Sequence, residues 1–173
     1  MALAFLLPFL NTGAQVSHKI DSLTQVLQRT TKPDVRFELY RKLVGLDPDK
    51  RKYKSALLLN AETSFNTELQ LKTYLLVIEI AGTDSTQFYL DKMFALAKED
   101  RSLEYQGWYY LSSGSMYYFT KADPAKAMEQ IREATSIAED EHLDSLAFEA
   151  YGVLAQIYRD KGERLLEYRA YQK

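Results

Sequence analysis

Residues 103–138, LEYQGWYYLSSGSMYYFTKADPAKAMEQIREATSIA, contain the clearest structural pattern in the chain. The first half places aromatic side chains around small residues, and the second half repeats apolar residues at helical spacing between charged ones. Asp123 can cap a second helix, and Pro124 suits its first turn because a proline has no N–H to lose there. The pattern predicts two antiparallel helices that meet at residues 122–124. Such a hairpin buries only one side by itself, so it needs neighbouring hairpins.

Turn signals recur along the chain at a nearly constant distance. Asp47 and Asp84 are 37 positions apart, Asp84 and Asp123 are 39 apart, and Asp123 and Gly162 are again 39 apart. A fixed period in this range is typical of helical-hairpin repeats, in which each unit contacts mainly its neighbours. We therefore expect an all-α, right-handed helical-hairpin solenoid of about nine helices, with four hairpins after one leading helix. No linker interrupts the pattern, so no internal boundary is expected within residues 15–173.

Cap residues and prolines mark the ends of the expected helices. The Asp47-Pro48 pair has the same cap-then-proline form as Asp123-Pro124 and is expected to open a helix. Gly82 is expected to end one helix as its C-terminal cap, and Asp84 or Ser85 to cap the next. The expected helices cover approximately residues 17–29, 33–45, 47–58, 69–80, 84–96, 103–119, 123–138, 143–160 and 162–173.

The composition excludes several classes of protein. Apolar residues make up 46% and charged residues 27% of the chain, which is ordinary for a soluble globular protein. The net charge of -2 does not suit a polyanion binder. No run of about 18 apolar residues suggests a spanning helix. The absence of cysteine excludes disulfides, thiolate metal sites, a cysteine nucleophile and a lipid-anchoring cysteine.

The amino end predicts export. Ala2–Leu10 is a compact apolar run, and the polar chain begins abruptly at Gln15 after a short stretch of small and polar residues. These features are typical of a secretory signal peptide over residues 1–14, with cleavage after Ala14. The alternative is a short buried N-terminal helix. Pro8 interrupts the apolar run and favours the signal peptide.

The second half of the chain resembles the tetratricopeptide repeat. Tyr151, Leu154, Ala155 and Tyr158 match the first-helix pattern of that family, and Gly162 falls at its turn. The same spacing occurs 40 positions earlier at Leu111, Gly114, Ser115 and Tyr118, followed by Ala127, Ile131 and Ala134. Small residues let two helices approach closely while the aromatic residue fills the gap. The chain departs from the family in its period, which is nearer 40 than 34, and at Glu167, where alanine is expected.

A signal peptide, a short leading helix and long repeats together resemble the exported N-terminal sensor regions of certain bacterial signalling proteins. In those proteins a membrane helix and a cytoplasmic kinase or DNA-binding domain follow the repeats. The resemblance implies a periplasmic location and a chain that continues beyond Lys173 into a membrane helix. The uncapped helix at residues 171–173 is expected to be a point of truncation.

A ligand groove is expected on the first helix of each of the last two hairpins. If the hairpins stack as in the tetratricopeptide family, Tyr109, Met116 and Phe119 share one stripe of residues 103–119, and rigid aromatic side chains with polar tips suit peptides or sugars. Trp108 and Tyr109 can equally pack between hairpins, as Tyr110, Tyr117 and Tyr118 are expected to do. The stripe of the later helix carries polar side chains. The predicted ligand-binding residues are Trp108, Tyr109, Met116, Phe119, Gln156 and Arg159.

The remaining polar patterns give little support for chemistry. The basic residues Lys50, Arg51, Lys52 and Lys54 are expected to be solvated, and nucleic-acid binding by this segment is not expected. His18 and His142 lack the partners of a metal site, so neither a metal nor another cofactor is expected. No phosphate loop or nucleophile elbow is visible, which predicts a protein that is not an enzyme.

Three functional hypotheses follow from the sequence. The first is a non-enzymatic exported repeat module that binds a protein or peptide, as the sensor or scaffold part of a longer signalling protein. The second is a periplasmic protein that binds a glycan or small molecule around Trp108 and Tyr109. The third is an enzyme with its site in the groove. The identity of the partner and the oligomeric state do not follow from the sequence.

Overall fold

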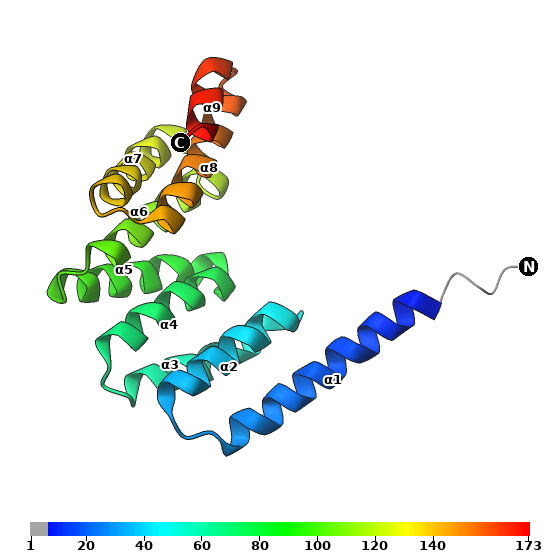
Figure 1. Cartoon of the computed structure of the whole chain (residues 1–173). Coiled ribbons are helices and arrows are strands. Elements are labelled where there is room, and N and C mark those ends of the chain that lie inside the picture. Colours follow the sequence, from blue (N-terminus) through cyan, green and yellow to red (C-terminus); the bar gives the residue numbers. More distant parts are fainter. Residues whose placement is uncertain (1–6) are drawn as a thin grey trace, which may run out of the picture. The chain divides into compact units, whose positions relative to one another are not determined.

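The computed structural model describes residues 7–173, apart from the side chains of residues 7–12, 83 and 84. Over this range the chain forms nine α-helices and one 3-10 helix and contains no strand (Figure 1). The elements are α1 (Leu7–Arg29), α2 (Pro33–Leu46), the 3-10 helix η1 (Lys50–Tyr53), α3 (Lys54–Glu62), α4 (Thr67–Ile80), α5 (Thr83–Glu99), α6 (Leu103–Phe119), α7 (Pro124–Asp140), α8 (Asp144–Asp160) and α9 (Arg164–Tyr171). The expected all-α architecture of helical hairpins is confirmed. The helices belong to two compact units, one ending at Ile80 and one beginning at Ala81.

In the first unit, α2 contacts α1, α3 and α4, and α3 also packs against α4. The guanidinium group of Arg36 joins the first three of these helices. It donates hydrogen bonds to the backbone oxygens of Leu27 (3.2 Å) and Thr30 (3.0 Å) and to Oδ1 of Asn60 (3.1 Å). These bonds satisfy carbonyl groups at the end of α1, which have no partner within that helix.

Asp47 ends α2 instead of opening a helix, so the expectation for the Asp47-Pro48 pair is wrong. The Asp47 carboxylate is buried and accepts hydrogen bonds from the Tyr53 hydroxyl (2.7 Å) and from the backbone N–H of Asp49 (2.9 Å). It also pairs with Lys52 Nζ at 2.5 Å. The carboxylate is therefore engaged across the connection, and α3 begins only at Lys54. The Lys52 ammonium and the Tyr53 hydroxyl hold the pKa of Asp47 at about 2.

The connection between α4 and α5 also differs from the expectation. Gly82 has φ −69° and ψ 158°, which is the extended conformation of an N-terminal cap residue and not the left-handed conformation of a helix C-terminus. Helix α5 begins at Thr83, so Ser85 lies inside its first turn and its hydroxyl bonds to the Gly82 carbonyl at 3.2 Å. The predicted roles of Gly82 as a C-cap and of Asp84 or Ser85 as an N-cap are therefore wrong.

In the second unit, the α6–α7 hairpin has the predicted turn. Oδ1 of Asp123 accepts a hydrogen bond from the backbone N–H of Lys126 at 3.1 Å, and Pro124 is the first residue of α7. The two glycines of α6 allow close packing. A Cβ atom at Gly114 would lie 2.6 Å from Cδ1 of Ile131 on α7, and one at Gly107 would collide with Leu146 on α8. A side chain at either position would require the neighbouring Ile131 or Leu146 side chain to move.

Each connection between the helices of this unit contains one residue with a left-handed backbone. These residues are Arg101, Ala122, His142 and Gly162, at successive separations of 21, 20 and 20 positions. After three of them the next backbone N–H bonds at 2.9 Å to a carbonyl five residues earlier, as in a Schellman turn. The nearly constant period in the sequence therefore corresponds to two such turns per hairpin.

Successive helices from α5 to α9 pack against each other, and α6 also contacts α8. This order of contacts is typical of stacked hairpins, in which alternate helices lie next to one another. One apolar core runs through the unit. Its buried members are Leu111, Ile131, Ala134, Ala138, Leu146, Ala150, Leu154, Ala155 and Ala170.

The predicted signal peptide is described only in part. Residues 1–6 lie outside the described residues, and residues 7–14 form the beginning of α1. Cleavage after Ala14 stays a prediction. Within residues 7–173, none of the helices combines the length and the apolar character needed to cross a membrane.

Candidate functional site

Trp108 lies partly buried on α6, where it packs against the apolar core of the second unit. It also lines a shallow hollow of about 350 Å³, together with residues at the start of α8. Those residues are Asp144, Ser145, Phe148 and Glu149. Trp108 therefore packs against the core with one part of its side chain and lines a hollow with another, and a ligand role for it stays a prediction.

Tyr109 and Met116 mainly serve packing. The ring of Tyr109 stacks on Phe94 of α5, with ring centroids 4.0 Å apart and an interplanar angle of 18°, and meets Tyr110 edge to face at 5.3 Å. Burial raises the pKa of the Tyr109 hydroxyl. Met116 is 8% exposed and leaves little surface for a ligand. The stacked Tyr109 ring stabilises the position of α6 against α5.

Phe119 is the most accessible of the predicted residues, with 67% of its surface exposed. It lies at the end of α6 and meets the Tyr118 ring edge to face, with ring centroids 4.9 Å apart. Both rings line a hollow of about 490 Å³, which we call the Phe119 hollow. Its other lining residues are Ala122, Pro124, Ile157, Asp160 and Lys161. An exposed aromatic ring beside a hollow of this volume is a common feature of ligand sites.

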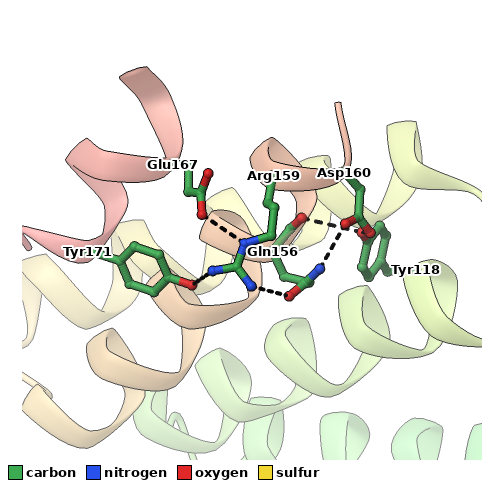
Figure 2. A network of polar contacts seen from close by, with 6 residues as sticks. All are labelled: Tyr118, Gln156, Arg159, Asp160, Glu167 and Tyr171. Carbon is green, nitrogen blue, oxygen red and sulfur yellow. Dashed lines mark hydrogen bonds and ion pairs between the residues drawn. The ribbon is translucent and has the colours of Figure 1, made fainter. Parts of the chain in front are cut away.

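The two polar residues predicted on α8 belong to a row of hydrogen bonds that links α6, α8 and α9 (Figure 2). Nε2 of Gln156 donates to Oδ1 of Asp160 at 2.8 Å, and the Tyr118 hydroxyl donates to the other oxygen of that carboxylate. At the other end of the row, Arg159 Nε donates to Glu167 at 2.8 Å. The terminal guanidinium nitrogens of Arg159 bond to the Tyr171 hydroxyl at 2.6 Å and to Oε1 of Gln156 at 3.4 Å.

The row joins the wall of the Phe119 hollow to α9. Tyr118 and Asp160 both line the hollow, and Gln156 connects their bond to Arg159. Burial and the neighbouring Asp160 carboxylate raise the pKa of Tyr118 to about 12, so its hydroxyl stays protonated at neutral pH. The ion pair with Glu167 raises the pKa of Arg159, whose side chain is 51% exposed. The side chains along this wall are thus held in place before any ligand arrives.

The structure brings together three of the six predicted residues, Phe119, Gln156 and Arg159, and places Trp108 in a separate hollow. Sequence reasoning missed the role of Asp160 and Lys161 in the wall and expected Tyr118 in the core. It noted Glu167 only as a departure from a repeat pattern that prefers alanine. That departure was a usable signal, because a charged residue at a small-residue position needs a partner, and Arg159 supplies it.

The polar groups of the row are mostly engaged with one another. The row uses its carboxylates and its guanidinium in mutual hydrogen bonds, and none of these bonds activates a nucleophile. Among the residues that the structure describes, no group of three or more His, Asp or Glu side chains could hold a metal ion. Comparison of the chain with protein-family models, with curated proteins and with solved structures found no match.

Proposed function

We propose that this chain is a non-enzymatic repeat module that binds an extended protein segment or peptide in the Phe119 hollow. The observation that carries the proposal is the 67% exposed Phe119 ring on a hollow of about 490 Å³ with a hydrogen-bonded wall. An apolar side chain of the peptide would contact the ring, and the polar row would supply hydrogen-bond partners along the α8 surface. Lys161 adds a positive charge at the edge of the hollow.

The wider setting of the module is a further part of the proposal. The apolar run before Gln15 and the likeness to exported sensor regions support export to the periplasm and a role as the sensor or scaffold part of a longer signalling protein. Fusion of residues 1–30 to a phosphatase that is active only outside the cytoplasm tests export. Phosphatase activity on whole cells is expected, and activity absent despite expression of the fusion would contradict it.

Binding is tested by selecting displayed random linear peptides on the immobilised chain and measuring the affinity of the recovered peptides. Substitution Phe119→Ala should weaken binding at least about tenfold, as for a central aromatic contact. The matched control is Phe148→Ala, which removes a ring that is 78% exposed and lies outside the Phe119 hollow. This variant should bind within about twofold of the parent. Recovery of no peptide, or equal loss in both variants, would contradict the proposal.

A second candidate function rests on the shallow hollow that Trp108 lines with Asp144, Ser145, Phe148 and Glu149, which we call the Trp108 hollow. Its aromatic ring and the carboxylates of Asp144 and Glu149 resemble the mixture of flat apolar surface and hydrogen-bond acceptors that a sugar requires. A glycan array separates the two functions. Sugar binding that Phe148→Ala weakens and Phe119→Ala leaves unchanged would favour the Trp108 hollow.

A further inference from the structure

The first unit contains a hollow of its own, of about 460 Å³, between α2, η1 and α4. Its lining residues are Phe37, Glu38, Arg41, Val44, Gly45, Lys50, Lys72, Leu75, Leu76 and Glu79. The volume lies in the range of about 300–1,000 Å³ that small-molecule sites occupy. The hollow belongs to a different unit from the Phe119 hollow.

The floor of this hollow is apolar. Phe37, Val44 and Leu76 are each no more than 8% exposed, and Leu75 beside them is partly exposed. These side chains already belong to the packed interior, which gives the floor a defined shape. Phe37, Val44 and Leu76 therefore offer only small accessible edges, and Leu75 supplies most of the accessible apolar surface of the floor. The apolar body of a ligand would leave water by lying on this surface.

The charges at the rim leave one cation uncompensated. Arg41 is paired with Glu38 at 2.7 Å, Lys72 is paired with Glu68 at 2.6 Å, and Glu79 also interacts with a neighbour. The Lys50 side chain is exposed, and its ammonium group has no hydrogen bond or ion pair to any residue in the described part of the chain. An anionic group at the mouth of the hollow would gain this partner, and the charge of Glu38 would not oppose it because Arg41 compensates it.

We propose that the hollow between α2, η1 and α4 binds a monoanionic amphiphile, a small molecule with one carboxylate and an apolar chain or ring. The carboxylate pairs with Lys50, and the apolar body lies on Leu75 and on the accessible edges of Phe37, Val44 and Leu76. From the sequence, the basic residues Lys50, Arg51, Lys52 and Lys54 are all expected to be simply solvated. Under this proposal, two of the four have different functions. Lys52 forms an ion pair with the buried Asp47, whereas Lys50 lines the hollow and pairs with the ligand.

Gly45 allows a steric test of this site. It lies on α2 at the edge of the hollow, and a Cβ atom added to it would meet no heavy atom within 4 Å. An alanine therefore fits at this position without displacing the protein, and a leucine there would begin at the edge of the ligand's space. The replacement also removes a glycine from a helix, which favours folding.

The experiment is calorimetric titration of the whole chain with decanoate below its micelle concentration, with decyltrimethylammonium as a probe of equal chain length and opposite charge. Decanoate is expected to bind with one-to-one stoichiometry, and the cation at least about tenfold more weakly. Lys50→Glu should weaken decanoate at least about tenfold. Lys42→Glu, which changes an exposed α2 lysine that does not line the hollow, should leave it within about twofold.

Gly45→Leu should abolish decanoate binding, whereas Gly45→Ala should retain it, and thermal unfolding shows that both variants are folded. Backbone and methyl NMR shifts provide a second measurement and should cluster around Leu75 and Leu76. The proposal is overturned if decanoate does not bind, if the cation binds equally well, or if Gly45→Leu or Lys50→Glu binds like the parent. Equal weakening by Lys42→Glu would also overturn it, because general charge attraction would then suffice.

Discussion

The substitution Gly114→Ala tests how closely α6 and α7 pack. A Cβ atom at this position would lie 2.6 and 2.7 Å from two side-chain carbons of Ile131 and 3.1 Å from the backbone oxygen of Ala127. Carbon atoms in contact prefer separations of about 3.5–4.0 Å, so the Ile131 side chain must move by about 1 Å. The Ala127 carbonyl belongs to the backbone of α7 and cannot move aside independently.

The magnitude follows from two opposing terms. Overpacking a well-filled core costs about 1–3 kcal/mol, and replacing a helical glycine with alanine contributes about 1 kcal/mol in the other direction. The free energy of unfolding should therefore fall by up to about 2 kcal/mol. Gly152→Ala is the matched control, because Gly152 lies on α8 with no atom within 4 Å of an added Cβ. It should raise the free energy by about 0.5–1 kcal/mol.

Urea unfolding followed by tryptophan fluorescence measures both variants. Trp108 is the single tryptophan of the chain and lies in the second unit, so its emission reports on the unit that carries the substitutions. In an Ile131→Ala background most of the cost of Gly114→Ala should disappear, since the two side chains are in contact, and only the contact with the Ala127 backbone oxygen remains. Close packing at Gly114 is refuted if Gly114→Ala stabilises the unit as much as Gly152→Ala does.

Three further predictions concern other parts of the chain. His142 and Gly162 both have a left-handed backbone, which glycine adopts more easily than other residues. His142→Gly should therefore raise the free energy of unfolding by about 1 kcal/mol, and Gly162→Ala should lower it by a similar amount. Urea midpoints that move in the opposite directions would contradict this. Thr73→Val should stabilise the first unit by about 1 kcal/mol in unfolding followed by circular dichroism, since its buried hydroxyl has no hydrogen-bond partner among the described residues. The pKa of Asp47 is lowered from 3.8 to about 2, so its stabilising contribution is complete above about pH 4 and is lost as the pH falls towards 2. Asp47→Asn should flatten this pH dependence, and an unchanged pH profile would count against the assignment.

The sequence was sufficient for the helices and for most of their ends. Pro33 and Pro124 begin helices as expected, because proline suits the first turn, and Asp123 caps α7. The prediction failed at Gly82, which has an extended backbone before α5, and at Asp47, where the local pattern matched that of Asp123-Pro124 but the outcome depended on contacts. The Asp47 carboxylate bonds to Lys52 and Tyr53, which follow Pro48 in the sequence. Rules for helix caps consider only backbone N–H groups as partners of such a carboxylate, so they do not predict this outcome.

For the candidate site, the sequence predicted only which residues share one face of α8. The spacing of Gln156 and Arg159 placed them on one side of α8, and their hydrogen bond agrees with that. Their partners Tyr118 and Tyr171 are 38 and 12 positions away from them in the sequence, and only the packing of three helices brings them together. The hollow in the first unit could not be foreseen, since it requires residues from α2, η1 and α4 together.

The most direct test of peptide binding is a titration of the isotope-labelled chain with a display-selected peptide, followed by NMR of the backbone amides. The proposed function predicts that the largest shift changes fall in residues 118–124 and 156–161, which form the Phe119 hollow and its polar wall. Shift changes concentrated in residues 144–149, around the Trp108 hollow, or confined to the first unit would contradict it.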